Sequence, residues 1–446
     1  MAELVPVAQS DLENVTRRIL DSAAKLGATA AETSVSTGVG ISVNVRLGEV
    51  ETIEYQRDRS LSLTCYQGES RGSASTGDFS EKAIAQTVEK ACSIARFTAH
   101  DSAAGLADKG RMATSLPDLS LCHPWNVDAN EAIKLATECE SAARSFDPRI
   151  QNSEGAGVST FVGTRVYGNS HGFVGGFSTS SHGISCSVLA KDDSGGMERD
   201  YWYSSMRDVN DLESARFVGE ESSRRAVARL GARKLSTRSA KVLFPARLAR
   251  GLFGHFFGAI SGGAQYRKST FLLEGKGRKV FPDFVSIREE PHIPKAFGSV
   301  PMDGEGVATY ARDVVADGVV QDYILSTYSA RRLGLETTAN AGGIQNMVVT
   351  AGTRTEQELI RDMGTGLIVN ELIGQGVNPL TGDYSRGAAG FWVENGEIAY
   401  PVHEITIAGN LNDMYSRMLA VSSDVDRLSK VHCGAVLLDD LTIAGN

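Results

Sequence analysis

A few serines, histidines and cysteines have the types and spacing that hydrolytic or metal chemistry requires. Residues 168–172, Gly-Asn-Ser-His-Gly, fit the G-x-S-x-G pattern of a nucleophilic serine. That pattern needs a strand, a sharp turn and then a helix, so that the serine stands at the start of the helix. The residues that follow, 173–178, are broken by glycines and predict a strand. We therefore interpret the pattern as a chance occurrence in a turn.

Metal ligation is suggested at three places where a histidine has a cysteine or a glutamate as its neighbour: Cys122–His123, His403–Glu404 and His432–Cys433. Neighbouring side chains in a strand point to opposite faces, and neither Cys–His pair has a second pair at zinc spacing. His403 could begin a zinc-binding helix, but Ile407 and Ala408 stand where the second histidine would be, and the alternation there predicts a strand. These three places predict packing or surface roles.

Residues 246–260 are the most informative segment, because apolar side chains recur there at helical spacing. They form one continuous stripe made by Leu248, Leu252, Phe256 and Ile260. Such a stripe predicts a helix with one face in the core. His255 lies among Gly251, Gly258 and Ala259, whose small size lets another backbone approach closely. A lone histidine in this setting predicts a hydrogen-bonded core residue rather than a metal ligand.

The elements that position these residues begin with an N-terminal α/β domain, predicted over residues 1–97. Ser10 with Glu13 predicts a capping box at the start of its first helix. The apolar periodicity then predicts strands over 39–45 and 61–65 and a second helix over 80–97. Residues 98–127 are punctuated by Asp, Ser, Gly and Pro without periodicity, which predicts a linker.

Two further blocks follow the linker. In the central block, 128–235, Asp128 and Glu131 predict a capping box, followed by a β-meander over 149–208 and a closing helix over 211–230. The C-terminal block, 236–446, is β-rich, with its strongest hairpin signal at Asn395–Gly396 and with helices near 355–363 and 410–420. There is no fixed-period repeat. Helices and strands in blocks, without strict alternation, predict an α+β fold in which a helix/sheet domain precedes β-rich domains with antiparallel sheets.

The composition excludes several classes of protein. The 446 residues are 41% hydrophobic and 22% charged, which is typical of two or three globular domains. Glycine is frequent, at 47 residues against 11 prolines, and indicates many tight turns. The net charge of −9 argues against a protein that coats itself in nucleic acid. Residues 1–4 are acidic where a signal peptide would be basic, and no apolar run is long enough for a membrane span. We expect a cytoplasmic protein with neither nucleic acid nor membrane as a partner.

Several long strings resemble the TldD/PmbA metallopeptidase family, and in particular its PmbA branch, also called TldE. Besides the helix over 246–260, the resemblance lies in residues 168–172, 262–272, 364–367, 382–396 and 404–411. These strings have low degeneracy, and the resemblance extends over essentially the whole chain.

This resemblance implies a cytoplasmic peptidase complex of two related subunits, one TldD-like and one PmbA-like. Its substrates are unfolded or extended peptides, including antitoxins and precursors whose leader is removed. The metal-bearing subunit of the family carries H-E-x-x-x-H, in which two histidines hold zinc and the glutamate acts as general base. His255 matches the first histidine, but Phe256 replaces the glutamate and Ile260 the second histidine. We therefore expect neither zinc nor a catalytic residue in this chain, and expect the zinc in a TldD-type partner, with a heterodimer as the main assembly and a homodimer as its alternative.

Two other functions stay open from the sequence. The first is a self-sufficient metallopeptidase whose ligands come from His171, His182 or His403 with a carboxylate. The second is a regulator in the DNA gyrase pathway, a label that the family also carries, although the acidic composition argues against direct DNA contact. The polar string 383–386 fits two roles equally, lining of a substrate chamber or hairpin structure, and no chamber residue is assigned.

Overall fold

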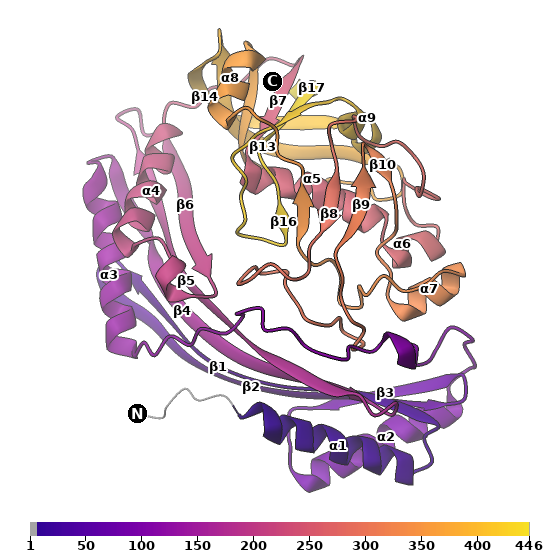
Figure 1. Cartoon of the computed structure of the whole chain (residues 1–446). Helices are drawn as coiled ribbons and strands as arrows, with labels where there is room; N and C mark the ends of the chain where they lie inside the picture. The colour runs from indigo at the N-terminus through magenta and orange to yellow at the C-terminus, as the bar shows by residue number, and fades with distance from the viewer. Residues whose placement is uncertain (1–6, 446) are drawn as a thin grey trace.

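The structure is a computed structural model that describes residues 7–445, and it contains three β-sheets with helices packed around them (Figure 1). The acidic residues 1–4 lie outside this described range. Among residues 7–445, no helix has the length and apolar character that crossing a membrane requires. The α+β fold class with antiparallel sheets is confirmed.

The N-terminal half contains the same order of elements twice, helix, three strands, helix. The first set is α1 (Gln9–Lys25), β1 (Ala30–Arg46), β2 (Glu49–Gln67), β3 (Ser70–Thr76) and α2 (Glu81–Phe97). The second set is α3 (Ala129–Phe146), β4 (Ile150–Asn169), β5 (Val174–Lys191), β6 (Met197–Met206) and α4 (Ala215–Ala228), with the short turn η2 (Val209–Asp211) before α4. A duplicated arrangement is therefore present although the sequence has no fixed-period repeat.

Both sets contribute to one six-stranded sheet in the order β3-β2-β1-β4-β5-β6. The central contact is the antiparallel pairing of β1 with β4, which joins residues 32–45 to residues 156–169. The four helices cover one face of this sheet, α1 and α2 at one end and α3 and α4 at the other (Figure 1). The blocks 1–97 and 128–235 thus share a continuous sheet.

The segment 98–127 contains one 3-10 turn, η1 (Lys109–Arg111), and otherwise no regular element. It is held by backbone hydrogen bonds on both sides. Ala113 donates to the Gly306 carbonyl at 3.0 Å, and the Leu121 carbonyl accepts from Ser180 at 2.9 Å. The segment therefore lies between the large sheet and the C-terminal half, and the division into separate domains at 98–127 and near 235 stays a prediction.

The C-terminal half contains two further sheets. One has the order β10-β9-β8-β11-β16 and is built from β8 (Ile287–Glu289), β9 (Arg312–Ala316), β10 (Val319–Val320), β11 (Met347–Val349) and β16 (Val431–His432). The other has the order β14-β13-β12-β7-β17-β15 and is built from β7 (Arg238–Phe244), β12 (Gly366–Ile373), β13 (Asp383–Glu394), β14 (Glu397–Asn410), β15 (Met418–Val421) and β17 (Val436–Ala444). An additional pairing of β14 with β17 closes five of these strands into a ring.

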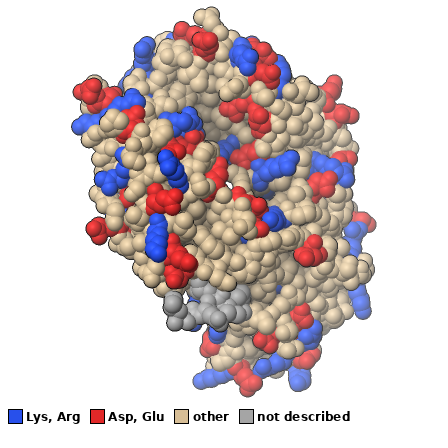
Figure 2. All heavy atoms as spheres, turned by 60° about the vertical axis from the view of Figure 1, so that its left-hand side comes forward, with Lys and Arg blue, Asp and Glu red and all other residues tan. Residues whose placement is uncertain are grey.

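Five helices pack around these sheets: α5 (Ala246–Ala259), α6 (Gly262–Tyr266), α7 (Thr327–Leu333), α8 (Glu356–Met363) and α9 (Leu411–Ser416). The largest hydrophobic core of the protein lies here and includes the buried face of α5. On the face shown in Figure 2, Lys and Arg side chains are interspersed with Asp and Glu side chains.

Several local predictions are confirmed. Asp128 and Glu131 form the capping box of α3. Asn395 and Gly396 have φ angles of 52° and 78° in the turn between β13 and β14. Positive φ at both central residues is what a two-residue hairpin turn requires.

Other boundaries were wrong. α1 begins at Gln9 after Ala8, without a side-chain cap, so that Ser10 lies inside its first turn and forms no capping box with Glu13. α9 ends at Ser416 and is followed directly by β15, so the helix predicted over 410–420 is too long. The closing helix predicted from 211 begins only at Ala215, where the Ser214 side chain caps it.

Candidate functional site

Helix α5 divides the core from an open groove. Pro245 precedes it, and its buried face packs on aromatic side chains. The ring centroid of Phe256 lies 5.0 Å from that of Phe281, and Phe281 lies 5.0 Å from Tyr415. The Tyr415 hydroxyl donates to the Leu252 carbonyl at 2.8 Å, which ties the helix to α9. These contacts fix the orientation of α5.

The opposite face of α5 has three glycines, so part of its backbone is uncovered. Gly251, Gly254 and Gly258 are exposed, and a Cβ added at any of them would meet no atom within 4 Å. The prediction of a close backbone approach is therefore wrong for Gly251 and Gly258, whereas Ala259 is buried in the core. Three cavities lie in a row along this face, and each shares α5 residues with the next. We call the depression that these three cavities form along the helix the α5 groove.

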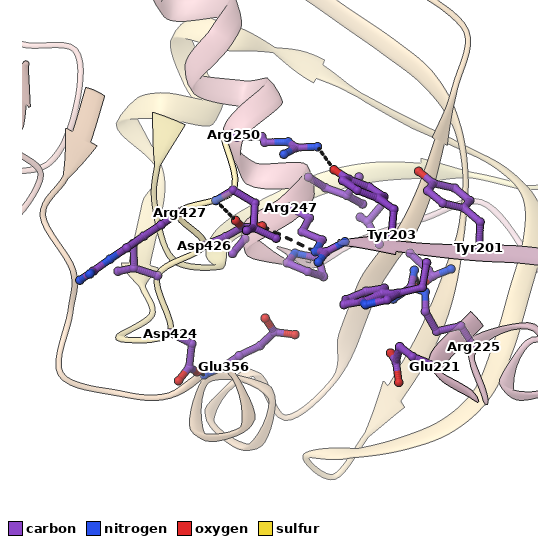
Figure 3. A pocket seen from close by; sticks show the side chains of 18 of the residues that line it. Tyr201, Tyr203, Glu221, Arg225, Arg247, Arg250, Glu356, Asp424, Asp426 and Arg427 are labelled. Atoms are coloured by element: carbon purple, nitrogen blue, oxygen red, sulfur yellow. Dashed lines mark hydrogen bonds and ion pairs between the residues drawn. The ribbon is translucent and has the colours of Figure 1, made fainter. Parts of the chain in front are cut away.

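The first cavity, of about 690 Å³, lies at the start of α5 (Figure 3). Its walls come from β6, α4, α8, β12 and residues 424–428. Arg247 stacks on Trp202, with the guanidinium carbon 3.5 Å from the ring centroid, and its Nε lies 3.7 Å from Asp426 Oδ2. The Arg250 guanidinium donates to the Tyr203 hydroxyl at 3.1 Å. Both arginines are thus partly engaged.

A hydrogen-bonded network joins the N-terminal half to the C-terminal half beside this cavity. Arg225 of α4 contacts Asp200 of β6 at 3.2 Å and donates to Asn370 Oδ1 of β12 at 3.0 Å. The Asn370 amide in turn donates to Asp200 Oδ2 at 2.9 Å. Because Asp200 is buried, this closed network favours one relative position of the two halves around the cavity.

Acidic side chains line the far side of the first cavity. The backbone amide of Glu356 donates to Asp424 Oδ2 at 2.6 Å, and Figure 3 shows both carboxylates at the same border. Burial, with the neighbouring Asp424 charge, raises the pKa of Glu356 above its usual range. Asp426 Oδ2 is buried and has no hydrogen-bond partner in the described part of the chain.

The central cavity, of about 180 Å³, shares Arg247, Leu248 and Arg250 with the first. His255 and, from β13, Tyr384 and Arg386 complete its polar lining. Burial and the nearby Arg386 charge lower the pKa of His255, so the imidazole is neutral at neutral pH.

The third cavity, of about 410 Å³, shares His255 with the central one. It is lined by Gly254 and Gly258 of α5 and by short polar side chains, among them Ser261 and Thr270. The α5 groove therefore runs from an end with charges of both signs, through a basic centre, to a stretch of mostly uncharged residues with Arg267 at its border.

The three positions matched to the zinc motif do not share a face. His255 borders the α5 groove and is half-buried, and its side chain makes no hydrogen bond within residues 7–445, so the expectation of a hydrogen-bonded core residue was wrong. Phe256 and Ile260 are both 0% exposed in the core. A glutamate or histidine at those two positions would point away from the groove.

No group of three or more His, Cys, Asp and Glu side chains in the described range could hold a metal ion. The histidines considered as alternative ligands are dispersed. His171 lies in the turn between β4 and β5, and His182 on β5 is bonded to Thr160 and to the His123 carbonyl, both at 2.8 Å. His403 on β14 lies 3.6 Å from Glu198. The residues present do not fit a zinc site.

The G-x-S-x-G segment is a structural turn. Ser170 exchanges two hydrogen bonds with Ala31, donating its backbone amide to the Ala31 carbonyl at 2.8 Å and accepting from the Ala31 amide at 3.1 Å. β5 follows it, not a helix, which confirms the chance interpretation.

Most residues of the groove could not be identified from the sequence. Arg247, Arg250 and Arg386 have no motif of their own, and they come from a helix and a strand far apart in the sequence. Two signals were present, the polar string 383–386 and the recurrence of Gly251, Gly254 and Gly258 along one side of a helix. The string lies in the β13–β14 hairpin, and Tyr384 and Arg386 line the central cavity from there; a role in a substrate chamber stays a prediction.

Comparison with known proteins assigns the chain to a protein family. Three family models match it, PmbA/TldA metallopeptidase domain 1 over residues 31–95, the central domain over 122–230 and the C-terminal domain over 237–445. The chain therefore belongs to the PmbA/TldA metallopeptidase family. Within that family its relatives place it in the PmbA branch, as the sequence resemblance predicted.

Two of these relatives are named metalloproteases. The chain is 49% identical to Metalloprotease PmbA of Escherichia coli O157:H7, over 93% of this chain and 92% of the relative. It is 45% identical to the Metalloprotease PmbA homolog of Haemophilus influenzae, over 99% of this chain and 98% of the relative.

Solved structures share the fold along the whole length. A crystal structure from Bacteroides thetaiotaomicron, described as a candidate modulator of DNA gyrase, superposes with a TM-score of 0.92 at 26% identity, covering 98% of this chain and 99% of that one. TldE from Thermococcus kodakarensis superposes with a TM-score of 0.84 at 18% identity, covering 97% and 100%, and shows the shared fold.

Proposed function

We propose that this chain is the PmbA-type, zinc-free subunit of a cytoplasmic metalloprotease complex and works with a TldD-type subunit that carries the zinc. The observation that carries the proposal is the α5 groove, which has donors and acceptors for binding a peptide but, among the described residues, no group of side chains that could hold a metal ion. Family membership supports the protease role.

The groove composition supports the zinc-free role. In its central and third cavities, His255 is the sole His, Cys, Asp or Glu among the described lining residues. A catalytic zinc needs three protein ligands and an open position, and the attacking water needs a base. One neutral imidazole meets neither requirement, so the catalytic groups come from the partner.

The dimensions of α5 support an extended peptide as the substrate. Its 14 residues make a helix about 21 Å long. An extended peptide rises about 3.3 Å per residue, so about six residues lie along it. Unfolded antitoxins and the leaders of peptide precursors present such segments, whereas a folded protein does not.

The experiment compares the lone chain, the TldD-type subunit and their complex. Zinc is measured by mass spectrometry of the metal, and cleavage is measured on an unfolded peptide with and without a zinc chelator. We expect zinc and chelator-sensitive cleavage in the complex and neither in the lone chain. Stoichiometric zinc with full activity in the lone chain would overturn the proposal and favour a self-sufficient metallopeptidase.

A role in the gyrase pathway by direct DNA contact receives no support from the charges. The net charge is −9, and basic side chains are interspersed with acidic ones on the face in Figure 2. The description as a candidate gyrase modulator belongs to the Bacteroides relative. A salt-dependent shift of duplex DNA by the purified chain would revive this function.

A further inference from the structure

We infer that the central cavity of the α5 groove binds a carboxylate group of a peptide. The inference rests on the proposed function in that it names the chemical feature of the substrate that this chain selects. Two sources supply the same chemistry, the C-terminal carboxylate of the peptide and an Asp or Glu side chain within it.

The charge of the cavity is one-sided. Arg247, Arg250 and Arg386 line it, and no Asp or Glu is among the described residues that form its wall. A concave site lined by one sign of charge attracts a ligand of the opposite sign, and guanidinium groups match the two oxygens of a carboxylate. The cavity therefore selects an anion.

Arg386 is the arginine with the most free donors. Arg247 lies between Trp202 and Asp426, and Arg250 donates to Tyr203. Arg386 makes a single long hydrogen bond, from Nη2 to the Leu372 carbonyl at 3.5 Å. Its Nε is buried and has no partner anywhere in residues 7–445. A buried donor without a partner costs free energy, which a bound acceptor recovers.

A second buried donor has the same character. Tyr384 is 2% exposed, and its hydroxyl has no hydrogen-bond partner in the described structure. Buried tyrosine hydroxyls usually find a partner. Burial raises the pKa of Tyr384 to about 12 against the opposing effect of the neighbouring Arg386 guanidinium, so the hydroxyl keeps its proton at neutral pH and can donate it to an oxygen. Two unpartnered donors, two residues apart on β13, thus border one small cavity.

The position of the cavity indicates a peptide rather than a free ion. It connects on one side to the first cavity through Leu248 and Arg250, and on the other side to the third cavity through His255. A chain lying along α5 would pass through all three. If the C-terminal carboxylate binds in the central cavity, the peptide ends there and occupies only one of the two neighbouring cavities. If an Asp or Glu side chain binds there, the peptide backbone continues into both neighbouring cavities.

The test measures peptide binding directly, so it needs neither zinc nor cleavage. Four octapeptides of alanine, serine and glycine carry a dansyl group at the N-terminus. One ends in a free carboxylate, one in an amide, one is an amide with a central glutamate, and one is an amide with glutamine there. Their affinities are measured on the lone full chain and on the complex.

We expect one comparison to show a difference of about 10-fold or more, the size of a charge-assisted hydrogen bond. If the peptide with a free C-terminal carboxylate binds more tightly than the amide, the C-terminal carboxylate is the ligand. If the amide peptide with a central glutamate binds more tightly than the one with glutamine, the acidic side chain is the ligand. Equal affinities in both comparisons, or no binding to either protein, would overturn the inference.

Variants then locate the binding. Tyr384→Phe keeps the buried ring and removes only the hydroxyl, and Arg386→Gln removes the charge; each should abolish most of the acid preference. Tyr400→Phe on β14 and Arg417→Gln, which pairs with Asp440 on the surface, are matched controls outside the α5 groove and should keep it. An acid preference that survives in Arg386→Gln and Tyr384→Phe would contradict this cavity as the site.

The outcomes separate the two proposals. If the chain prefers acidic peptides but its complex has no zinc-dependent protease activity, the carboxylate inference holds and the proposed function is wrong. An active complex that shows no acid preference does the reverse.

Discussion

The rings of His255 and Tyr384 meet edge to face, with centroids 6.3 Å apart and planes at 79°. This contact joins α5 to β13 at the wall of the central cavity, across 129 positions of sequence. The imidazole is therefore held against an aromatic ring at the wall of the central cavity.

Restoring the zinc motif should damage the protein instead of activating it. Phe256→Glu with Ile260→His places a carboxylate and an imidazole in a core whose two native residues are 0% exposed. Burying an unpaired carboxylate costs several kcal/mol, so we expect loss of cooperative folding by circular dichroism and no bound zinc. Gly251→His, on the open face four residues before His255, is the control and should fold. A folded double variant with one zinc per chain would contradict the assignment of these positions to the core.

Two helical glycines should respond oppositely to alanine. Gly254→Ala on α5 meets no atom within 4 Å, so the better helix propensity of alanine should raise the free energy of unfolding by about 0.5–1 kcal/mol. Gly219→Ala on α4 would place its Cβ 2.1 Å from the Cys139 carbonyl oxygen of α3, so it should lower that free energy. Urea unfolding measures both.

A larger side chain on the same open face should affect function without affecting folding. Gly254→Leu fills part of the third cavity, so we expect a lower kcat/KM of the complex for unfolded peptides. Gly110→Leu, also in open space but away from the groove, is the control. Unchanged peptide cleavage by Gly254→Leu would exclude the third cavity from the substrate path.

The contribution of Asp303 to stability should fall as the pH rises from about 4 to about 7. Burial, with the charge of Glu305, raises the pKa of Asp303 from 3.8 to about 7. Between those values the unfolded chain has lost a proton that the folded chain still holds, so the unfolding free energy decreases with pH. Above about 7 both states are ionised and the dependence on this group ends.

Asp303→Asn should flatten this dependence in melting curves taken between pH 4 and pH 8. Asp193→Asn, in the exposed turn before β6, should leave the curve unchanged. Burial also raises the pKa of Glu305, so a residual slope of the same sign is expected in Asp303→Asn. An unaltered slope would show that Asp303 titrates normally in the folded protein.

The turn between β1 and β2 should depend on a buried carboxylate from α3. Glu140 is 1% exposed and accepts the amides of Leu47 at 2.7 Å and Gly48 at 2.8 Å. Glu140→Ala removes two charge-assisted hydrogen bonds, so we expect a loss of about 2–4 kcal/mol in the free energy of unfolding. Glu138→Ala, exposed on the same helix, should change it by less than about 0.5 kcal/mol. Equal effects would contradict the role of Glu140.

Local features could be predicted from the sequence because neighbouring residues determine them. The Asp128 cap, the Asn395–Gly396 turn and the buried stripe of α5 all depend on residues within a few positions. Leu252, Phe256 and Ile260 are buried as their spacing predicts.

Long-range relationships could not be predicted in the same way. The pairing of β1 with β4 joins residues more than 100 positions apart, and no local periodicity encodes it. The groove has the same origin, because Arg386 and His255 come together only when β12 pairs with both β13 and β7, the strand that precedes α5. The glycines of α5 show the limit directly, since a missing side chain is equally compatible with close packing and with open space.

The place of β17 in the fold bears on how the protein is made. This last strand, residues 436–444, lies between β7 and β14 and completes the ring. A nascent chain leaving the ribosome already contains α5, β12 and β13, but two of their supporting strands keep bare edges until β17 arrives. The ring of strands therefore closes only once residues 436–444 have been made, and a shorter chain offers unpaired strands to chaperones or to other nascent chains.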